Sequence, residues 1–201
     1  MTGPERSTLP TRSVLLQRFE TAIDNLGGRT SLVAADEIPT QLRSLLSHSI
    51  QTLGIYQSPL TAQFIPKTFA DGLTDLSVTW LPAIKPEDFD EKEYRQKMMT
   101  MDAGLIAADY LIADSGTVVL FGKDHRAQMI TLLPPKLFVL GTVQQLVSDL
   151  FTFHEVIEKE PRHQFESMHY ITGPSRTSDI EKKLILGVHG PKELCVVIVQ
   201  E

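Results

Sequence analysis

Arg176 is the residue whose surroundings most clearly suggest chemistry. It lies between the hydroxyl residues Ser175 and Thr177, and the pair Gly173-Pro174 precedes all three. An arginine side chain can hold a carboxylate or a phosphate through two parallel hydrogen bonds, and neighbouring hydroxyl groups add donors. The pattern therefore indicates a small-anion site formed by Gly173, Ser175, Arg176 and Thr177.

The residues that follow predict how this site is built. Ser178 and Glu181 have the spacing of a capping box, in which each side chain accepts a hydrogen bond from a backbone N–H group at the start of a helix. We expect a strand to end before Gly173 and a helix to begin at Ser178. Free N–H groups and the positive end of the helix dipole would then face the ligand. Capping alone would explain Ser178 and Glu181, but it does not require Arg176.

His189 is a second candidate, because it lies in a predicted turn between Gly187 and Gly190. Histidine titrates near neutral pH and can serve as an acid, a base or a hydrogen-bond donor. An ordinary turn residue is the simpler interpretation, and the proximity of His189 to Arg176 in the sequence favours a functional one. His189 is therefore a candidate catalytic residue.

Asp114 is the third candidate, and Ser115, Gly116 and Thr117 follow it. A carboxylate and two hydroxyl groups around a glycine could contact a ligand closely. Asp114 would then be a candidate acid or base, and Ser115 and Thr117 would bind the ligand. The same four residues are typical of a β-turn between antiparallel strands, and the local pattern favours that interpretation.

The other histidines do not form a metal site by their spacing. His154 and Glu155 resemble the start of a zinc-protease helix, but Glu158 occupies the position of the second histidine. His154 falls on the apolar face of a predicted helix, which favours a buried core histidine. Neither common glycine-rich phosphate loop occurs in the sequence. The sequence thus predicts no metal site and no nucleotide loop.

Alternating helices and strands must position these candidates. Apolar residues at helical spacing predict helices over residues 15–26, 38–53 and 143–157, the first of them stopped by Gly27 and Gly28. Short apolar runs predict strands at residues 31–34, 54–56, 76–80, 110–113, 117–121, 137–140, 168–172 and 194–199. This alternation predicts an α/β fold, a single domain with a mostly parallel sheet flanked by helices.

Charge and apolar content exclude several classes of protein. The chain has 201 residues, 25 acidic and 19 basic, and a net charge of −6. The basic residues form no stripe or tail, which argues against a nucleic-acid partner. No run approaches the roughly 20 apolar residues that span a bilayer, and no apolar secretory leader is visible. We expect a cytoplasmic protein without membrane insertion, with a flexible N-terminus over residues 1–12 and one domain over residues 13–201.

Cys195 is the only cysteine, and it lies inside an apolar run. That position predicts a buried strand residue that behaves as a small hydrophobe. A single thiolate cannot hold an iron–sulfur cluster, which usually needs four protein ligands. We therefore expect no such cofactor in this chain.

Five segments together resemble the LUD-domain family, in particular its short lactate utilization protein C (LutC, YkgG-like) branch. They are ADY at 108–110, IADSGT at 112–117, LLPP at 132–135, TGPSRTSDIE at 172–181 and GVHGP at 187–191. The resemblance covers about the second half of the chain. It implies a fold similar to that of the NagB/RpiA/CoA-transferase-like proteins.

The resemblance also implies a role in lactate catabolism. Members of this branch belong to a three-protein system that oxidises L-lactate to pyruvate, in which two partner proteins carry the cysteines for iron–sulfur clusters. With Cys195 alone, this chain resembles the cluster-free member. Its task would be assembly, or binding of the lactate carboxylate through Arg176.

Two alternatives stay open at this point. The chain could be a free-standing enzyme on an isomerase-like or CoA-transferase-like scaffold, with Asp114 and His189 as acid and base and Arg176 holding an anionic substrate. Fold analogy alone is weak evidence for such an activity. The chain could also be an interaction domain whose pocket is empty.

Overall fold

The main sheet of the protein is entirely parallel. The computed structural model describes residues 10–46, 49–71, 75–81, 90–122, 125–159, 167–178, 184–186 and 190–200. Six strands pair in the order β1-β12-β7-β4-β2-β3, and each pairing is parallel. The strands are β1 (Arg29–Ala34), β2 (Thr52–Tyr56), β3 (Ser77–Leu81), β4 (Ala103–Ala107), β7 (Lys136–Thr142) and β12 (Glu193–Gln200). The predicted α/β class with a mostly parallel sheet is confirmed.

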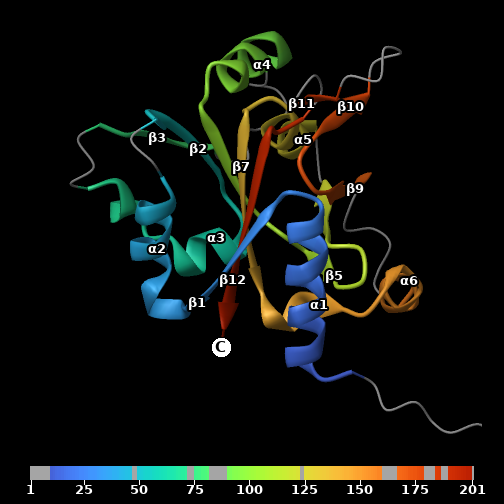
Figure 1. Ribbon diagram of the computed structural model, residues 1–201. Coiled ribbons are helices and arrows are strands. Elements are labelled where there is room, and N and C mark those ends of the chain that lie inside the picture. The colour runs from blue at the N-terminus through green and yellow to red at the C-terminus, as the bar shows by residue number, and fades with distance from the viewer. Residues whose placement is uncertain are drawn as a thin grey trace, which may run out of the picture.

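Helices cover both faces of this sheet. The helices are α1 (Arg12–Asn25), α2 (Ile38–Leu45), α3 (Pro59–Phe64), α4 (Glu91–Met99), α5 (His125–Leu132) and α6 (Leu150–Ile157), of which α1 to α5 pack on this sheet. Along β12, Val196 and Ile198 pack in the core that holds α1, α4 and α5, whereas Val197 and Val199 pack with α2 and α3. Figure 1 shows α2 and α3 on one side of the sheet and α1 on the other. The apolar strands are thus buried on both faces, as parallel sheets require.

A second sheet lies on the α1 side of the first. Its order is β8-β5-β6-β9, with β5 antiparallel to β6, β6 antiparallel to β9, and β5 parallel to β8. Its strands are β5 (Tyr110–Ile112), β6 (Thr117–Gly122), β8 (Leu146–Val147) and β9 (Ser167–Thr172). Leu111 and Val118 face the core beneath α1, while Ile112 and Val119 face Phe153 of α6. One face of this sheet therefore joins the main core, and the other forms a small core of its own.

All eight predicted strands are present where the sequence indicated them. Residues of all eight predicted strands lie in β1, β2, β3, β5, β6, β7, β9 and β12. The first predicted helix is α1, and its backbone turns away at Leu26 and Gly27. Cys195 is a buried residue of β12, as expected. None of the helices described is both long and apolar enough to cross a membrane.

Two predicted helices are wrong in extent. Helix α2 ends at Leu45, and Leu53 belongs to β2, where it is fully buried. The helix predicted over residues 143–157 is divided into a 3-10 turn, Val143–Gln145, then β8 and α6. Asp149 caps α6, because its carboxylate accepts a hydrogen bond from the Thr152 N–H at 2.8 Å. The apolar residues Leu146 and Val147, which precede that cap, belong to a strand. The helical spacing across residues 143–157 therefore does not reflect one continuous helix.

The shift in helix boundary also changes the environment of His154. The sequence predicts a buried core histidine, and the structure contradicts this, because His154 is exposed. The residue of α6 that is fully buried is its neighbour Phe153. The starting residue of the helix decides which side chains face inward, and Asp149 sets that start.

Asp102 joins the beginnings of β4 and β2, and its charge is expected to contribute to stability. Its carboxylate accepts hydrogen bonds from the N–H groups of Gln51 and Thr52 and from the Thr52 hydroxyl, each at 2.9 Å. The Gln51 backbone, together with the donors of Thr52 and the charge of Lys136, lowers the pKa of Asp102 against the opposing effect of burial.

Replacing Asp102 by Asn should destabilise the fold at pH 7 by about 1 kcal/mol, the size of one such hydrogen bond. Because the folded pKa lies below the unfolded one, the stabilisation is fully present above the unfolded value and is lost as the pH falls through the folded value. Urea titrations of both proteins between pH 7 and pH 3 should show their stabilities converging in acid. A constant difference at all pH values would contradict a role for the charge.

Candidate functional site

The turn that carries Asp114 connects two antiparallel strands. Tyr110–Ile112 and Thr117–Gly122 pair as β5 and β6, so the predicted β-turn is confirmed. Gly116 has φ +60° in this turn, and a Cβ there would lie 2.8 Å from the Ile23 backbone nitrogen. The turn therefore needs glycine for its backbone conformation and for its contact with α1.

Three hydroxyl groups form a chain at the end of this turn. The Oγ of Ser115 lies 2.7 Å from the Oγ1 of Thr117, and the latter lies 2.8 Å from the Oγ1 of Thr172. The antiparallel register of β6 and β9 places Thr117 directly opposite Thr172. The structure thus joins the segment of Asp114 to the segment of Gly173.

Gly173 begins the segment that the sequence singles out first. It has φ +79°, and a Cβ there would lie 2.8 Å from the Cβ of Leu26, the residue that ends α1. Both glycines of the candidate segments, Gly116 and Gly173, therefore lie against the C-terminal part of α1. Helix α1 is the element against which the two segments are aligned.

The helix predicted to begin at Ser178 falls on residues 179–183, which lie outside the described residues. Arg176–Ser178 form strand β10, which pairs antiparallel with β11, Leu184–Leu186. Thr177 pairs with Ile185, and β-branched residues of this kind favour extended backbone. The N–H groups and dipole of a helix N-terminus are therefore not part of the described site.

The segment around Gly190 and Pro191 contacts the segment that begins at Gly173. The Ser175 N–H donates to the Pro191 carbonyl oxygen at 2.8 Å. This contact does not locate the side chain of Arg176 or that of Thr177. His189 lies outside the described residues. The anion-binding role of Arg176 and Thr177 and the catalytic role of His189 therefore stay predictions.

Two hollows open on either side of the end of α1. The first has a volume of about 350 Å³ and is lined by Thr172, Gly173, Ser175, Gly190 and other residues. We call it the anion pocket, after the anion that the sequence predicts for this segment. The second has a volume of about 560 Å³ and lies between α1 and the Asp114 turn. Leu26 lines both, so the end of α1 separates them.

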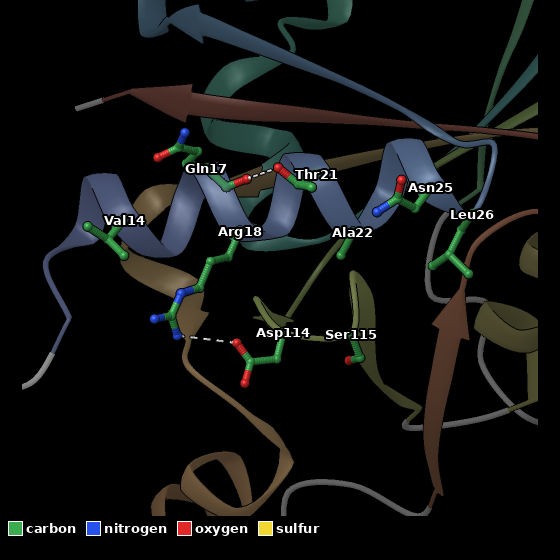
Figure 2. Close-up of a pocket in the computed structure, with 9 residues that line it drawn as sticks. All are labelled: Val14, Gln17, Arg18, Thr21, Ala22, Asn25, Leu26, Asp114 and Ser115. Carbon is green, nitrogen blue, oxygen red and sulfur yellow. Dashed lines mark hydrogen bonds and ion pairs between the residues drawn. The ribbon is translucent and has the colours of Figure 1, made fainter.

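Arg18 is a polar residue of the second hollow that sequence reasoning missed. Figure 2 shows its side chain extending from α1 toward Asp114, and the closest nitrogen and oxygen are 3.4 Å apart. Both side chains are about half exposed, so the pair contributes little to stability. No local pattern could have linked two residues 96 positions apart; only the packing of the turn on α1 does so.

The candidate residues are therefore brought together only in part. Asp114, Ser115, Thr117, Gly173 and Ser175 lie around the end of α1, joined by the hydroxyl chain that includes Thr172. Over the described ranges, no three His, Cys, Asp or Glu side chains are grouped so that they could hold a metal ion. The arrangement is suited to hydrogen bonding with a small polar ligand.

Several known proteins that share the name lactate utilization protein C are similar in sequence to this chain. Lactate utilization protein C of Halalkalibacterium halodurans is 33% identical over 113 residues, which are 53% of this chain and 47% of the relative. The protein of that name from Geobacillus kaustophilus is 33% identical over 129 residues, 61% and 50% of the two chains. Uncharacterized protein YkgG of Escherichia coli is 31% identical over 132 residues, 62% and 53% of the two chains. This chain spans about half the length of the curated relatives it matches.

A solved structure and a family model cover nearly the whole chain. The crystal structure of a DUF162 family protein from Deinococcus radiodurans superposes with a TM-score of 0.66 and 20% sequence identity, covering 95% of this chain and 99% of that one. At that identity the likeness concerns the fold. The model of the LUD domain matches residues 16–199. The chain therefore belongs to the LUD domain family.

Proposed function

We propose that this chain is a cluster-free component of a lactate-utilization system and that it binds a small carboxylate such as lactate. The observation that carries the proposal is the similarity to several proteins named lactate utilization protein C. The site supports binding, because hydroxyl groups and backbone of three separate segments surround the anion pocket. The proposed setting is the cytoplasm, together with cysteine-rich iron–sulfur partners that oxidise L-lactate to pyruvate.

The residues of this chain do not fit an iron–sulfur cluster. Cys195 is the only cysteine, and a cluster usually takes four thiolate ligands. Burial in β12 raises the pKa of the Cys195 thiol to about 11, despite the opposing effect of Arg29. Oxidation of lactate needs a cofactor, because protein side chains seldom accept its electrons. In this proposal the partner proteins supply that chemistry.

The ligand carboxylate is proposed to bind in the anion pocket. Thr172 lines it and belongs to the hydroxyl chain, and Ser175 lies directly before Arg176. An arginine on a short strand beside hydroxyl groups could hold a carboxylate by charge-assisted hydrogen bonds. The role of Arg176 follows from its residue type and position in the sequence.

Replacing Arg176 by Ala should weaken lactate binding at least ten-fold, since hydrogen bonds to charged groups contribute about 1.5–3 kcal/mol. Calorimetric titration of the purified chain with L-lactate measures this. Arg18→Ala is the matched control, because Arg18 lies on the other side of the end of α1 and lines the second hollow. Weaker binding in Arg18→Ala with unchanged binding in Arg176→Ala would show that the site has been assigned to the wrong arginine.

The place of the chain in a larger system needs a separate experiment. The tagged protein, expressed at its native level and purified gently from lactate-grown cells, should bring with it cysteine-rich proteins, iron and lactate oxidation. Iron and activity should both leave when the partners are removed. Turnover by the isolated chain would instead favour the free-standing enzyme, and an isolated iron-free chain without partners would contradict the proposed complex.

A further inference from the structure

A third pocket lies between the small sheet and the start of α6. Its volume is about 620 Å³, within the range typical of small-molecule sites. We call it the α6 pocket. Leu150, Phe151, Tyr170 and the three residues of the hydroxyl chain line it. Nothing in the lactate proposal uses its apolar part.

Exposed apolar side chains gather around this pocket. Phe151 is 84% exposed, Leu150 48% and Tyr170 44%, and all three line it. They are three of the seven large apolar side chains exposed among the described residues. Exposed apolar groups that cluster at one hollow are typical of a binding site.

An aromatic cluster adjoins Tyr170 beneath the pocket-lining residues. The ring of Phe153 contacts Tyr110 and Tyr170, with ring centroids 5.3 Å and 6.0 Å apart, both in edge-on geometry. Tyr170 thus contacts this aromatic cluster and also lines the pocket. A flat ring placed in the pocket can extend this cluster, because aromatic pairs favour such contacts.

One proton of the hydroxyl chain has no acceptor within the chain itself. Ser115, Thr117 and Thr172 form two hydrogen bonds with one another, and three hydroxyl groups carry three protons. One proton is therefore left over at an end of the chain, and all three residues line the α6 pocket. The chain can donate to an oxygen atom of a ligand, and by reversing its direction it can also accept from a ligand hydroxyl.

Two carboxylates at the same pocket define the charge of the ligand. Asp149 accepts hydrogen bonds from Ser148, at 2.6 Å, and from the backbone and hydroxyl of Thr152, and these donors lower its pKa. Asp114 is paired with Arg18. The negative charge of Asp149 disfavours an anion, and because both carboxylates already have partners, they do not require a cation.

We propose that the α6 pocket binds a flat, uncharged aromatic molecule that carries a hydroxyl or carbonyl group. The ring lies against Phe151 and Tyr170, and the oxygen atom meets the chain of Ser115, Thr117 and Thr172. This site is separate from the anion pocket, although Tyr170 and Thr172 line both. The proposal does not depend on lactate as the other ligand.

The fluorescent probe 2-naphthol tests this proposal at pH 7, with 2-naphthoate as its charged counterpart. Saturable binding of 2-naphthol is expected, with binding of 2-naphthoate about ten-fold weaker. The double variant Ser115→Ala/Thr172→Val removes both ends of the hydroxyl chain, and it should weaken 2-naphthol binding about five-fold, the factor for one neutral hydrogen bond. Phe151→Ala should weaken it about three-fold or more through lost apolar contact.

Met99→Ala is the matched control, because Met99 is 61% exposed and lies on α4; its binding should equal that of the unmodified chain. A thermal melt of each variant checks that it is folded, and the exposed Phe151 keeps the test usable if Ser115→Ala/Thr172→Val is unstable. Absence of saturable 2-naphthol binding would overturn the proposal, as would equal binding of 2-naphthoate or unchanged binding in folded Phe151→Ala. If the chain binds 2-naphthol but not lactate, the proposed function is contradicted and the α6 pocket proposal is still supported.

Discussion

Replacing Phe153 by Ala should reduce the free energy of unfolding by about 3–5 kcal/mol, the usual cost of removing a buried phenylalanine. The side chain is fully buried between α6 and the small sheet, where it packs with Ile112 and Val119. It also contacts the rings of Tyr110 and Tyr170. This core has few members, so neighbouring side chains cannot easily fill the cavity left behind. Urea denaturation at pH 7 measures the loss.

Phe151 provides the matched control for this substitution. It belongs to the same helix, two positions earlier, and is 84% exposed. Phe151→Ala should change the free energy of unfolding by less than about 0.5 kcal/mol, as is usual for surface positions. Similar effects of the two substitutions would mean that α6 is packed on the small sheet in a different rotation. Hydrogen exchange should show β6 and α6 opening more readily in Phe153→Ala alone.

The contrast between these two phenylalanines shows where sequence periodicity is insufficient. Over residues 143–157 the spacing favours one long helix with Phe151 and His154 on its apolar face. The cap at Asp149 starts a new helix, and Phe153 becomes its buried residue. Leu146, which precedes the cap, belongs to β8. This strand pairs with β5, which lies much earlier in the chain. Pairing between distant segments is not visible in a local window.

Strands of the main sheet could be predicted because they are buried on both faces. In β12 every residue from Leu194 to Val199 is buried, so the segment is continuously apolar and short. The hairpin of β5 and β6 was predictable from its turn residues. Strand β4 was not identified, since Ala103 and Gly104 give it small side chains and weak strand propensity. Its glycine is explained by Ile130 of α5, which would lie 2.8 Å from a Cβ at Gly104.

The candidate site was predictable as a set of segments but not as an arrangement. Residue types alone selected Asp114, Ser115, Thr117, Gly173 and Ser175, and the structure places them around the end of α1. The contribution of α1 itself, through Arg18 and Leu26, could not be predicted, because it arises from packing across the domain. The hydroxyl chain likewise depends on the register that sets Thr117 opposite Thr172.

Replacing Gly116 by Ala should destabilise the protein by about 2–5 kcal/mol. The left-handed backbone conformation at φ +60° costs an alanine about 1–2 kcal/mol. The new Cβ would also lie 2.8 Å from the Ile23 nitrogen and 3.0 Å from the Ala22 carbonyl carbon, and overpacking of this kind typically costs about 1–3 kcal/mol. Because these are backbone atoms of α1, no side chain can move aside. Urea denaturation of the variant measures the sum.

Gly116→Asn separates the two causes, since asparagine tolerates the left-handed conformation better than alanine but has the same Cβ. If contact with α1 dominates, the two variants should be destabilised almost equally. If backbone conformation dominates, the asparagine variant should recover about 1 kcal/mol. A stability loss below about 1 kcal/mol in both would mean that the turn does not rest on α1. In that case helix α1 would not be the element against which the Asp114 turn is aligned, and the proposed role of α1 in forming the second hollow would be lost.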